Sequence, residues 1–126
     1  MSDEIVKQPD PNADTAAPVP AVRSGPPRIE RYFRAMTKHN ASDLHFKADT
    51  PAKFRLKGDI RNIEAVPLTH EMIESMVFDI MDERQIAAYR AKGSVDFAYQ
   101  IGNADRFRIN AFRQRGKMSM AARRVP

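Results

Sequence analysis

Residues 106–112, RFRINAF, decide the fold of the C-terminal half, because basic and apolar side chains alternate along them. Alternation with period two is typical of a strand with two unlike faces. The polar face of this strand would hold Arg106, Arg108 and Asn110. The apolar face would hold Phe107, Ile109 and Ala111. The stretch therefore predicts a sheet that is buried on one side and basic on the other.

A second strand follows in residues 118–126, MSMAARRVP, and it brings Arg123 and Arg124 to the end of the chain. After Asp105 the chain contains basic residues and no acidic ones. A rigid sheet with several unpaired guanidinium groups suits phosphate or carboxylate. A charge cluster is also common on a solvated surface that binds nothing, and the composition leaves both interpretations open.

Composition divides the 126 residues into a leader and one small domain. Residues 1–27 hold six of the nine prolines and four acids against two bases, which predicts a disordered leader. Residues 28–126 are long enough for a single core. No apolar run suits a signal peptide or a membrane span, so we expect a cytoplasmic protein without a transmembrane segment. The absence of cysteine excludes disulfides.

Outward from the arginine strands, apolar spacing and turn residues predict the remaining elements. Helices are expected over residues 28–39, 69–81 and 82–92. Strands are expected over residues 42–47, 53–56, 60–63, 95–101, 106–112 and 118–126. Thr69 suits a helix N-cap, whereas Asn40 and Gly93 suit left-handed helix ends. This order predicts an α+β fold, with helices packed on one face of a largely antiparallel sheet.

The chemistry that would make the chain an enzyme by itself is missing. Gly116-Lys117 is its only Gly-Lys pair, and Ala111 and Met118 replace the residues that a phosphate-binding loop requires. The histidines, with no cysteine, sit at unrelated positions, so no zinc set forms. We predict no catalytic residue and no metal site. His45 is expected to be a strand histidine bonded to a neighbouring carbonyl or carboxylate, and Asp43 to fix the strand entry.

Four stretches together match a known family. They are 41–45 (ASDLH), 50–59 (TPAKFRLKGD), 79–81 with 95–97 (DIM and VDF), and 106–114 (RFRINAFRQ), of which the last is the most specific. In this order the elements resemble the N-terminal domain of the type II/type IV secretion ATPases, most closely the twitching-motility, pilus-retraction branch. The resemblance covers residues 28–126.

The resemblance implies a PAS-like domain that precedes a RecA-like motor domain, which is absent from this chain. ATP and Mg²⁺ would be bound through that motor domain and not by this chain alone. It also implies a hexameric ring that works at an inner-membrane pilus or secretion platform protein, peripheral to the membrane. The implied function is a nucleotide-sensing and hexamer-interface module that is not catalytic by itself.

The resemblance also implies site residues. Arg108 and Arg123 match the two family arginines that contact the terminal phosphate, so that ATP but not ADP closes the domain. Arg106, Arg113 and Arg124 would support them. Bidentate guanidinium groups suit this role, since lysine cannot supply the same geometry.

The chain departs from the family pattern at three places. Lys57 stands where an aspartate usually precedes the hairpin glycine, and Ala122 stands where a larger apolar residue is common. The chain ends at Pro126, where the linker to the motor domain would begin. The position of this end favours a truncated chain over a free-standing regulatory form.

Two other functions remain open at this point. The basic strands could bind nucleic acid, with Phe107 and Phe112 interleaved among the cations. Against that, Phe107 shares the apolar face, and Phe112 alone is too little for a stacking platform, so we do not expect nucleic acid as the partner. A PAS-like sensor holding a small ligand is the third interpretation, although nothing in the sequence names a ligand.

Overall fold

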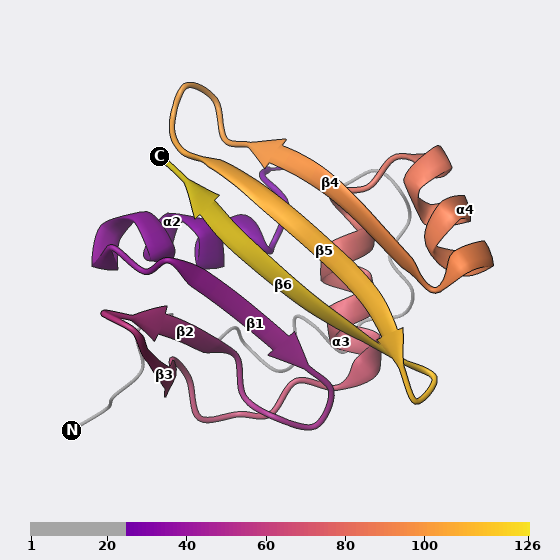
Figure 1. Cartoon of the computed structure of the whole chain (residues 1–126), viewed down its shortest axis with the longest axis horizontal. Coiled ribbons are helices and arrows are strands. Elements are labelled where there is room, and N and C mark those ends of the chain that lie inside the picture. Colours follow the sequence, from indigo (N-terminus) through magenta and orange to yellow (C-terminus); the bar gives the residue numbers. More distant parts are fainter. Residues whose placement is uncertain (1–24) are drawn as a thin grey trace.

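The computed structural model describes residues 25–126, which form one six-stranded sheet with three helices on one side. The strand order is β3-β2-β1-β6-β5-β4, and all neighbours are antiparallel. In Figure 1 the helices lie behind the sheet. The predicted α+β class is therefore confirmed. The predicted leader, apart from its last three residues, lies outside the described residues.

The elements follow the chain in the predicted order. The helices are α2 (Glu30–His39), α3 (His70–Phe78) and α4 (Glu83–Lys92). The strands are β1 (Asp43–Lys47), β2 (Lys53–Leu56), β3 (Asp59–Asn62), β4 (Ser94–Gln100), β5 (Arg106–Gln114) and β6 (Lys117–Val125).

The helix ends follow from local chemistry. Asn40 and Gly93 adopt left-handed conformations, with φ of 56° and 79°, at the ends of α2 and α4. Thr69 caps α3 by accepting a hydrogen bond from the Met72 amide at 3.1 Å. The predicted extension of α3 to residue 81 is wrong, because the helix ends at Phe78. Amides 80 and 81 bond to carbonyls three residues back, and Asp82 then starts α4 with a capping box.

The core lies between the sheet and the helices. Phe33 of α2 stacks on Phe107 of β5, with ring centroids 4.6 Å apart. Tyr32 meets Phe46 of β1 edge-on at 4.9 Å. All four rings are at most 1% exposed, so the apolar face of the arginine strand is the core face of the sheet, as its alternation predicted.

The pairing of β1 with β6 joins the two halves of the chain. The C-terminal meander β4-β5-β6 contributes three strands, and the N-terminal hairpins contribute the other three. β1 pairs along its whole length with β6, so that Asp43 lies opposite Arg123. This long-range pairing brings a carboxylate from the start of the domain beside the predicted phosphate-contacting arginines.

Candidate phosphate-binding face of the sheet

We call the sheet surface that bears no helix the open face. The viewer looks onto it in Figure 1. The strand register places four charged residues in one row across it, namely Arg108, Arg123, Asp43 and Arg55, each opposite the next. Residues directly opposite on antiparallel strands have Cβ atoms about 4.5–5.5 Å apart. The row is therefore a compact cluster of three guanidinium groups around one carboxylate.

Arg108 and Arg106 lie at the β5 end of this cluster, and both are exposed. Within residues 25–126, neither side chain has a hydrogen bond or an ion pair. Arg108 faces Arg123 directly across the strand pair. Like charges in directly opposite positions are destabilising, so this pair favours an anion that bridges it.

Asp43 lies between Arg123 and Arg55. Its Oδ2 is 3.3 Å from Arg123 Nε, and its Oδ1 is 3.9 Å from Arg55 Nε. The Ser42 hydroxyl donates a hydrogen bond to Oδ1 at 2.6 Å. Burial raises the pKa of Asp43, but the bonds from Ser42 and Arg123 outweigh burial and hold this pKa below its usual value. Asp43 is therefore an ionised carboxylate at neutral pH.

The other two predicted arginines lie on the opposite, helix-covered face. Arg113 Nη2 donates to the Tyr89 and Arg90 carbonyls at the end of α4, at 3.4 and 3.3 Å, and its guanidinium stacks over the Tyr89 ring. Arg124 donates to the Ala41 carbonyl at 3.1 Å, ion-pairs with Asp105 at 3.2 Å and bonds to Asn40 after α2.

The structure therefore divides the five predicted arginines into two sets. Arg106, Arg108 and Arg123 project from the open face, where a ligand can approach. Arg113 binds carbonyls at the C-terminal end of α4, and Arg124 binds Asn40 and the Ala41 carbonyl just after α2. Cations are favourable near the C-terminal end of a helix dipole. The two predicted primary phosphate contacts are together in space, and two of the three predicted supporting residues are not beside them.

His45 lies on the open face, two residues after Asp43 in β1 and therefore on the same side of the strand. Its Nε2 is buried and has no hydrogen-bond partner in the described part of the chain, so the expected bond is not made at that nitrogen. Burial lowers the pKa of His45; Asp43 opposes this shift, while Arg55 and Lys53 add to it. His45 lines a shallow pocket of about 360 Å³. Half-buried Phe112 lines the same pocket.

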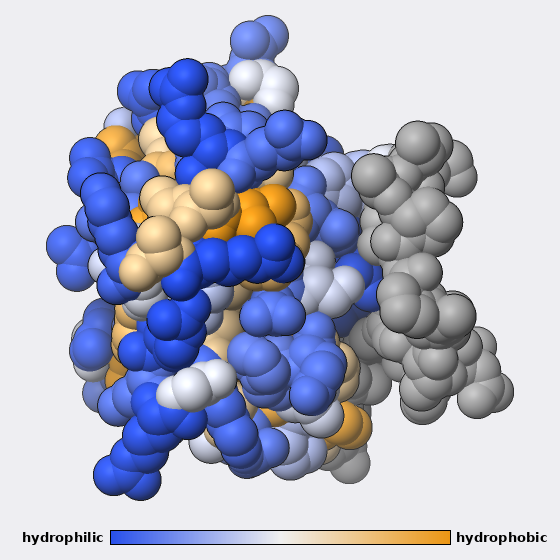
Figure 2. Space-filling view, turned by 90° about the vertical axis from the view of Figure 1, so that its right-hand side faces the viewer, coloured by the Kyte–Doolittle hydropathy of each residue, from blue (hydrophilic) through white to orange (hydrophobic). Residues whose placement is uncertain are grey.

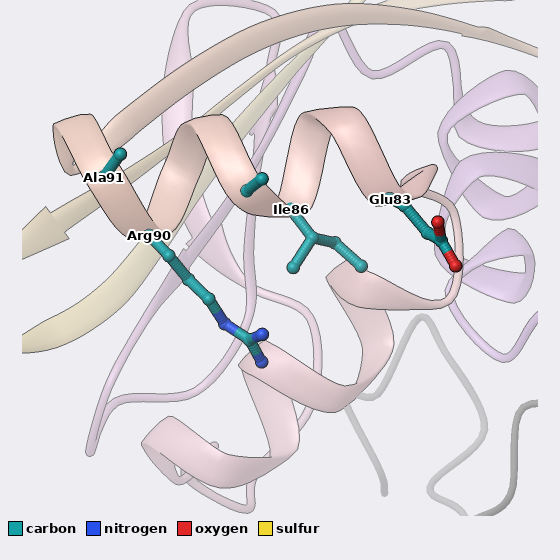
Figure 3. A pocket seen from close by; sticks show the side chains of 5 residues that line it. Glu83, Ile86, Arg90 and Ala91 are labelled. Carbon is teal, nitrogen blue, oxygen red and sulfur yellow. The ribbon is translucent and has the colours of Figure 1, made fainter.

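A second groove lies along α4, away from the arginine cluster. Figure 2 shows a small apolar patch there, rimmed by polar side chains. Ile86 and Arg90 project from the same side of the helix (Figure 3), and the Arg90 guanidinium covers the Phe78 ring at 5.4 Å. Glu83 is the remaining charged residue of the lining. The charged lining of this groove is therefore one acid and one base, which is not a cluster of like-charged or catalytic side chains.

Residues 25–126 contain no cluster of three or more histidine or carboxylate side chains that could hold a metal ion. None of the helices described is long and apolar enough to span a bilayer.

Comparison with known proteins gives the family context of this face. No protein-family model matches the chain. The type IV pilus retraction ATPase PilT of Pseudomonas aeruginosa is 35% identical over 89 residues, which are 71% of this chain and 26% of PilT. The type IV pilus ATPase PilU of the same organism is 29% identical over 97 residues, 77% of this chain and 25% of PilU.

Solved structures agree with these sequences. The pilus retraction motor PilT, crystallised with bound ADP, superposes with a TM-score of 0.72 and 27% identity, over 78% of this chain and 29% of that one. The chain is related to the N-terminal domain of the secretion ATPases. The Legionella pneumophila ATPase DotB, at 19% identity and a TM-score of 0.66, shows the same fold over 78% of this chain and 28% of DotB.

This relative of the secretion ATPases spans about a quarter of the length of the curated proteins that it matches. Two features of its open face were not among the predicted site residues: Arg55, and the role of Asp43 between two arginines. Period-two spacing in β2 could have placed Arg55 on one face with Lys53. No local sequence signal shows that the Arg55 face of β2 lies on the same side of the sheet as the Arg123 face of β6, because β1 lies between these two strands.

Proposed function

We propose that the chain is the nucleotide-sensing N-terminal module of a pilus or secretion ATPase, in which Arg108 and Arg123 contact the terminal phosphate of ATP. One observation carries the proposal: these two arginines face each other on adjacent strands of an open, helix-free sheet surface. The proteins to which this chain is similar are named as ATPases, and one of them was crystallised with ADP.

In this proposal the nucleotide is held elsewhere, by a RecA-like motor domain that also binds Mg²⁺. The two arginines share one open face of the sheet, so in this proposal the domain would contribute positive charge and geometry to the nucleotide. Within residues 25–126 Arg108 has no partner to give up, and Arg123 is paired through Nε, which leaves its Nη groups for a phosphate. A terminal phosphate bound by both arginines would hold the domain against the motor, whereas ADP would release it.

Arg106 would support this contact from the same face, by raising the positive potential beside Arg108. Arg113 and Arg124 would support it indirectly, by fixing α4 and α2 against the sheet. We further propose a hexameric ring, an inner-membrane pilus or secretion platform protein as partner, and a cytoplasmic location peripheral to that membrane.

The test is made in a complete ATPase that has this domain in front of its motor domain. Arg108→Ala and Arg123→Ala are each expected to lower ATP hydrolysis by at least about 100-fold, since an arginine on a transferring phosphate contributes about 10³–10⁵ in rate. Steady-state hydrolysis and native mass spectrometry would be measured together, and the hexamer should persist in both variants.

Arg115→Ala is the matched control. Arg115 is exposed in the turn between β5 and β6, so its loss should leave hydrolysis within about twofold of the wild type. Wild-type turnover in Arg108→Ala and Arg123→Ala would refute their assignment as phosphate contacts. In the same preparation, salt-dependent binding of a random oligonucleotide would favour the nucleic-acid alternative.

A further inference from the structure

Asp43 is a carboxylate built into a cluster of cations, and its backbone is fixed on both sides. The Ser42 amide donates to the Arg55 carbonyl at 3.0 Å, and the Arg124 amide donates to the Ser42 carbonyl at 3.0 Å. These bonds lock the start of β1 between β2 and β6. The Asp43 side chain is 13% exposed, so its position is set by the sheet and not by solvent.

Arg123 is the opposite case, because its side chain is 74% exposed. An exposed arginine samples many rotamers, and ordering it costs up to about 2 kcal/mol of side-chain entropy. Its only side-chain bond in the described structure runs from Nε to Asp43 Oδ2, at 3.3 Å. That bond holds the guanidinium at Nε, and within the described residues neither Nη group has a hydrogen-bond partner.

We infer that Asp43 is a positioning residue that holds the Arg123 guanidinium through Nε, so that its two Nη groups are presented together to a phosphate. This inference rests on the proposed function, since it concerns the same arginines. A guanidinium bonds a phosphate best through two parallel N–H groups, and an orienting carboxylate supplies that geometry before the ligand arrives.

A simple charge argument predicts the opposite result, which makes the inference testable. Asp43 is an anion close to the proposed phosphate, so by repulsion alone its removal should tighten anion binding. If Asp43 acts by positioning, its removal should weaken binding although a negative charge has been lost. The sign of the change therefore separates the two effects.

The experiment uses the 126-residue chain and inorganic triphosphate as the probe, with affinity read from amide NMR shifts at physiological ionic strength. Asp43→Ala is expected to weaken binding about 3- to 10-fold, as the loss of one orienting interaction of a partly exposed pair. Asp43→Asn keeps an oxygen that can accept from Nε and should restore binding to at least the wild-type level.

Asp96→Ala is the matched control on the same face. Asp96 Oδ1 accepts a hydrogen bond from the side-chain Nδ2 of Asn110 at 2.8 Å and has no arginine partner among the described residues, so removing it changes the charge without disturbing Arg123. Its triphosphate affinity should be unchanged or slightly higher. A second measurement needs no variant that risks misfolding: the Arg123 Nε–H of the wild type should exchange with water more slowly than that of Arg108.

Each outcome decides a specific point. Suppose that triphosphate binding is lost in Arg108→Gln and Arg123→Gln, which shows that it requires both arginines. If binding is then equal or tighter in Asp43→Ala, the inference is overturned and the proposed function stands. Equally fast Nε–H exchange in Arg123 and Arg108 also overturns the inference alone. Binding that survives Arg108→Gln and Arg123→Gln, or no binding by the wild type, overturns the proposed phosphate contact and this role with it.

Discussion

Arg123 and Arg124 are consecutive residues of β6, but they lie on opposite faces of the sheet. The Arg123 side chain is 74% exposed and has one partner within residues 25–126, a carboxylate. The Arg124 side chain is 18% exposed and bonds to a carbonyl, a carboxylate and an amide oxygen at the end of α2. β5 repeats this division, with Arg108 on the open face and Arg113 against α4.

The difference shows that arginine content does not define a binding face. On the helix-covered face, Arg113 and Arg124 join helix ends to the sheet through bonds to carbonyls and a carboxylate. On the open face, arginines have capacity to spare, and the strand framework holds them in fixed relative positions. Only the second set can bind a ligand without breaking contacts that stabilise the fold.

The largest expected difference in stability between the two faces is at neighbouring positions of β5. Phe107→Ala should destabilise the domain by about 3–5 kcal/mol, since the fully buried ring stacks on Phe33 and leaves a cavity when removed. Arg108→Ala should change stability by less than about 0.5 kcal/mol, because the side chain is exposed and has no partner among the described residues. Urea unfolding of both variants provides the measurement.

Similar losses of stability in the two β5 variants would contradict the division into a structural and a ligand-facing side.

The consecutive arginines of β6 give a second, smaller test. Arg124→Ala should cost about 1–2 kcal/mol, because the Ala41 carbonyl and the Asp105 carboxylate lose a part-buried partner. Arg123→Ala should cost no more than about 0.5 kcal/mol, as for most exposed ion pairs. Thermal unfolding followed by circular dichroism would rank them. A larger loss in Arg123→Ala than in Arg124→Ala would break the comparison.

The smallest expected effect is on pH dependence. The pKa of Asp43 is lower in the folded state than the unfolded value of about 3.9, because the hydrogen bonds from Ser42 and Arg123 outweigh burial. Its contribution to stability is therefore complete above about pH 4 and is lost as the pH falls through the lower, folded pKa. Urea midpoints at pH 6 and pH 3 should differ less in Asp43→Asn than in the wild type.

An equal difference between the two midpoints in both proteins would show that Asp43 adds nothing to acid stability.

Sequence alone determined the local structure of this chain. Period-two alternation in residues 106–112 correctly placed Phe107 in the core and Arg108 on the other face. Asn40, Thr69 and Gly93 marked the helix ends where they occur. These features depend on backbone preferences and on spacing within a few residues, so they are visible without a fold.

Only the tertiary structure decided which side chains meet. Arg123 and Asp43 are 80 residues apart in sequence, and they become neighbours because β1 pairs with β6. Likewise, Arg113 binds the end of α4 because β5 pairs with β4, which begins directly after that helix. Alternation tells which residues share a face of one strand, but pairing partners and register are set by burial across the whole sheet. The separation of open-face arginines from those that bind helix ends is for that reason a property of the fold.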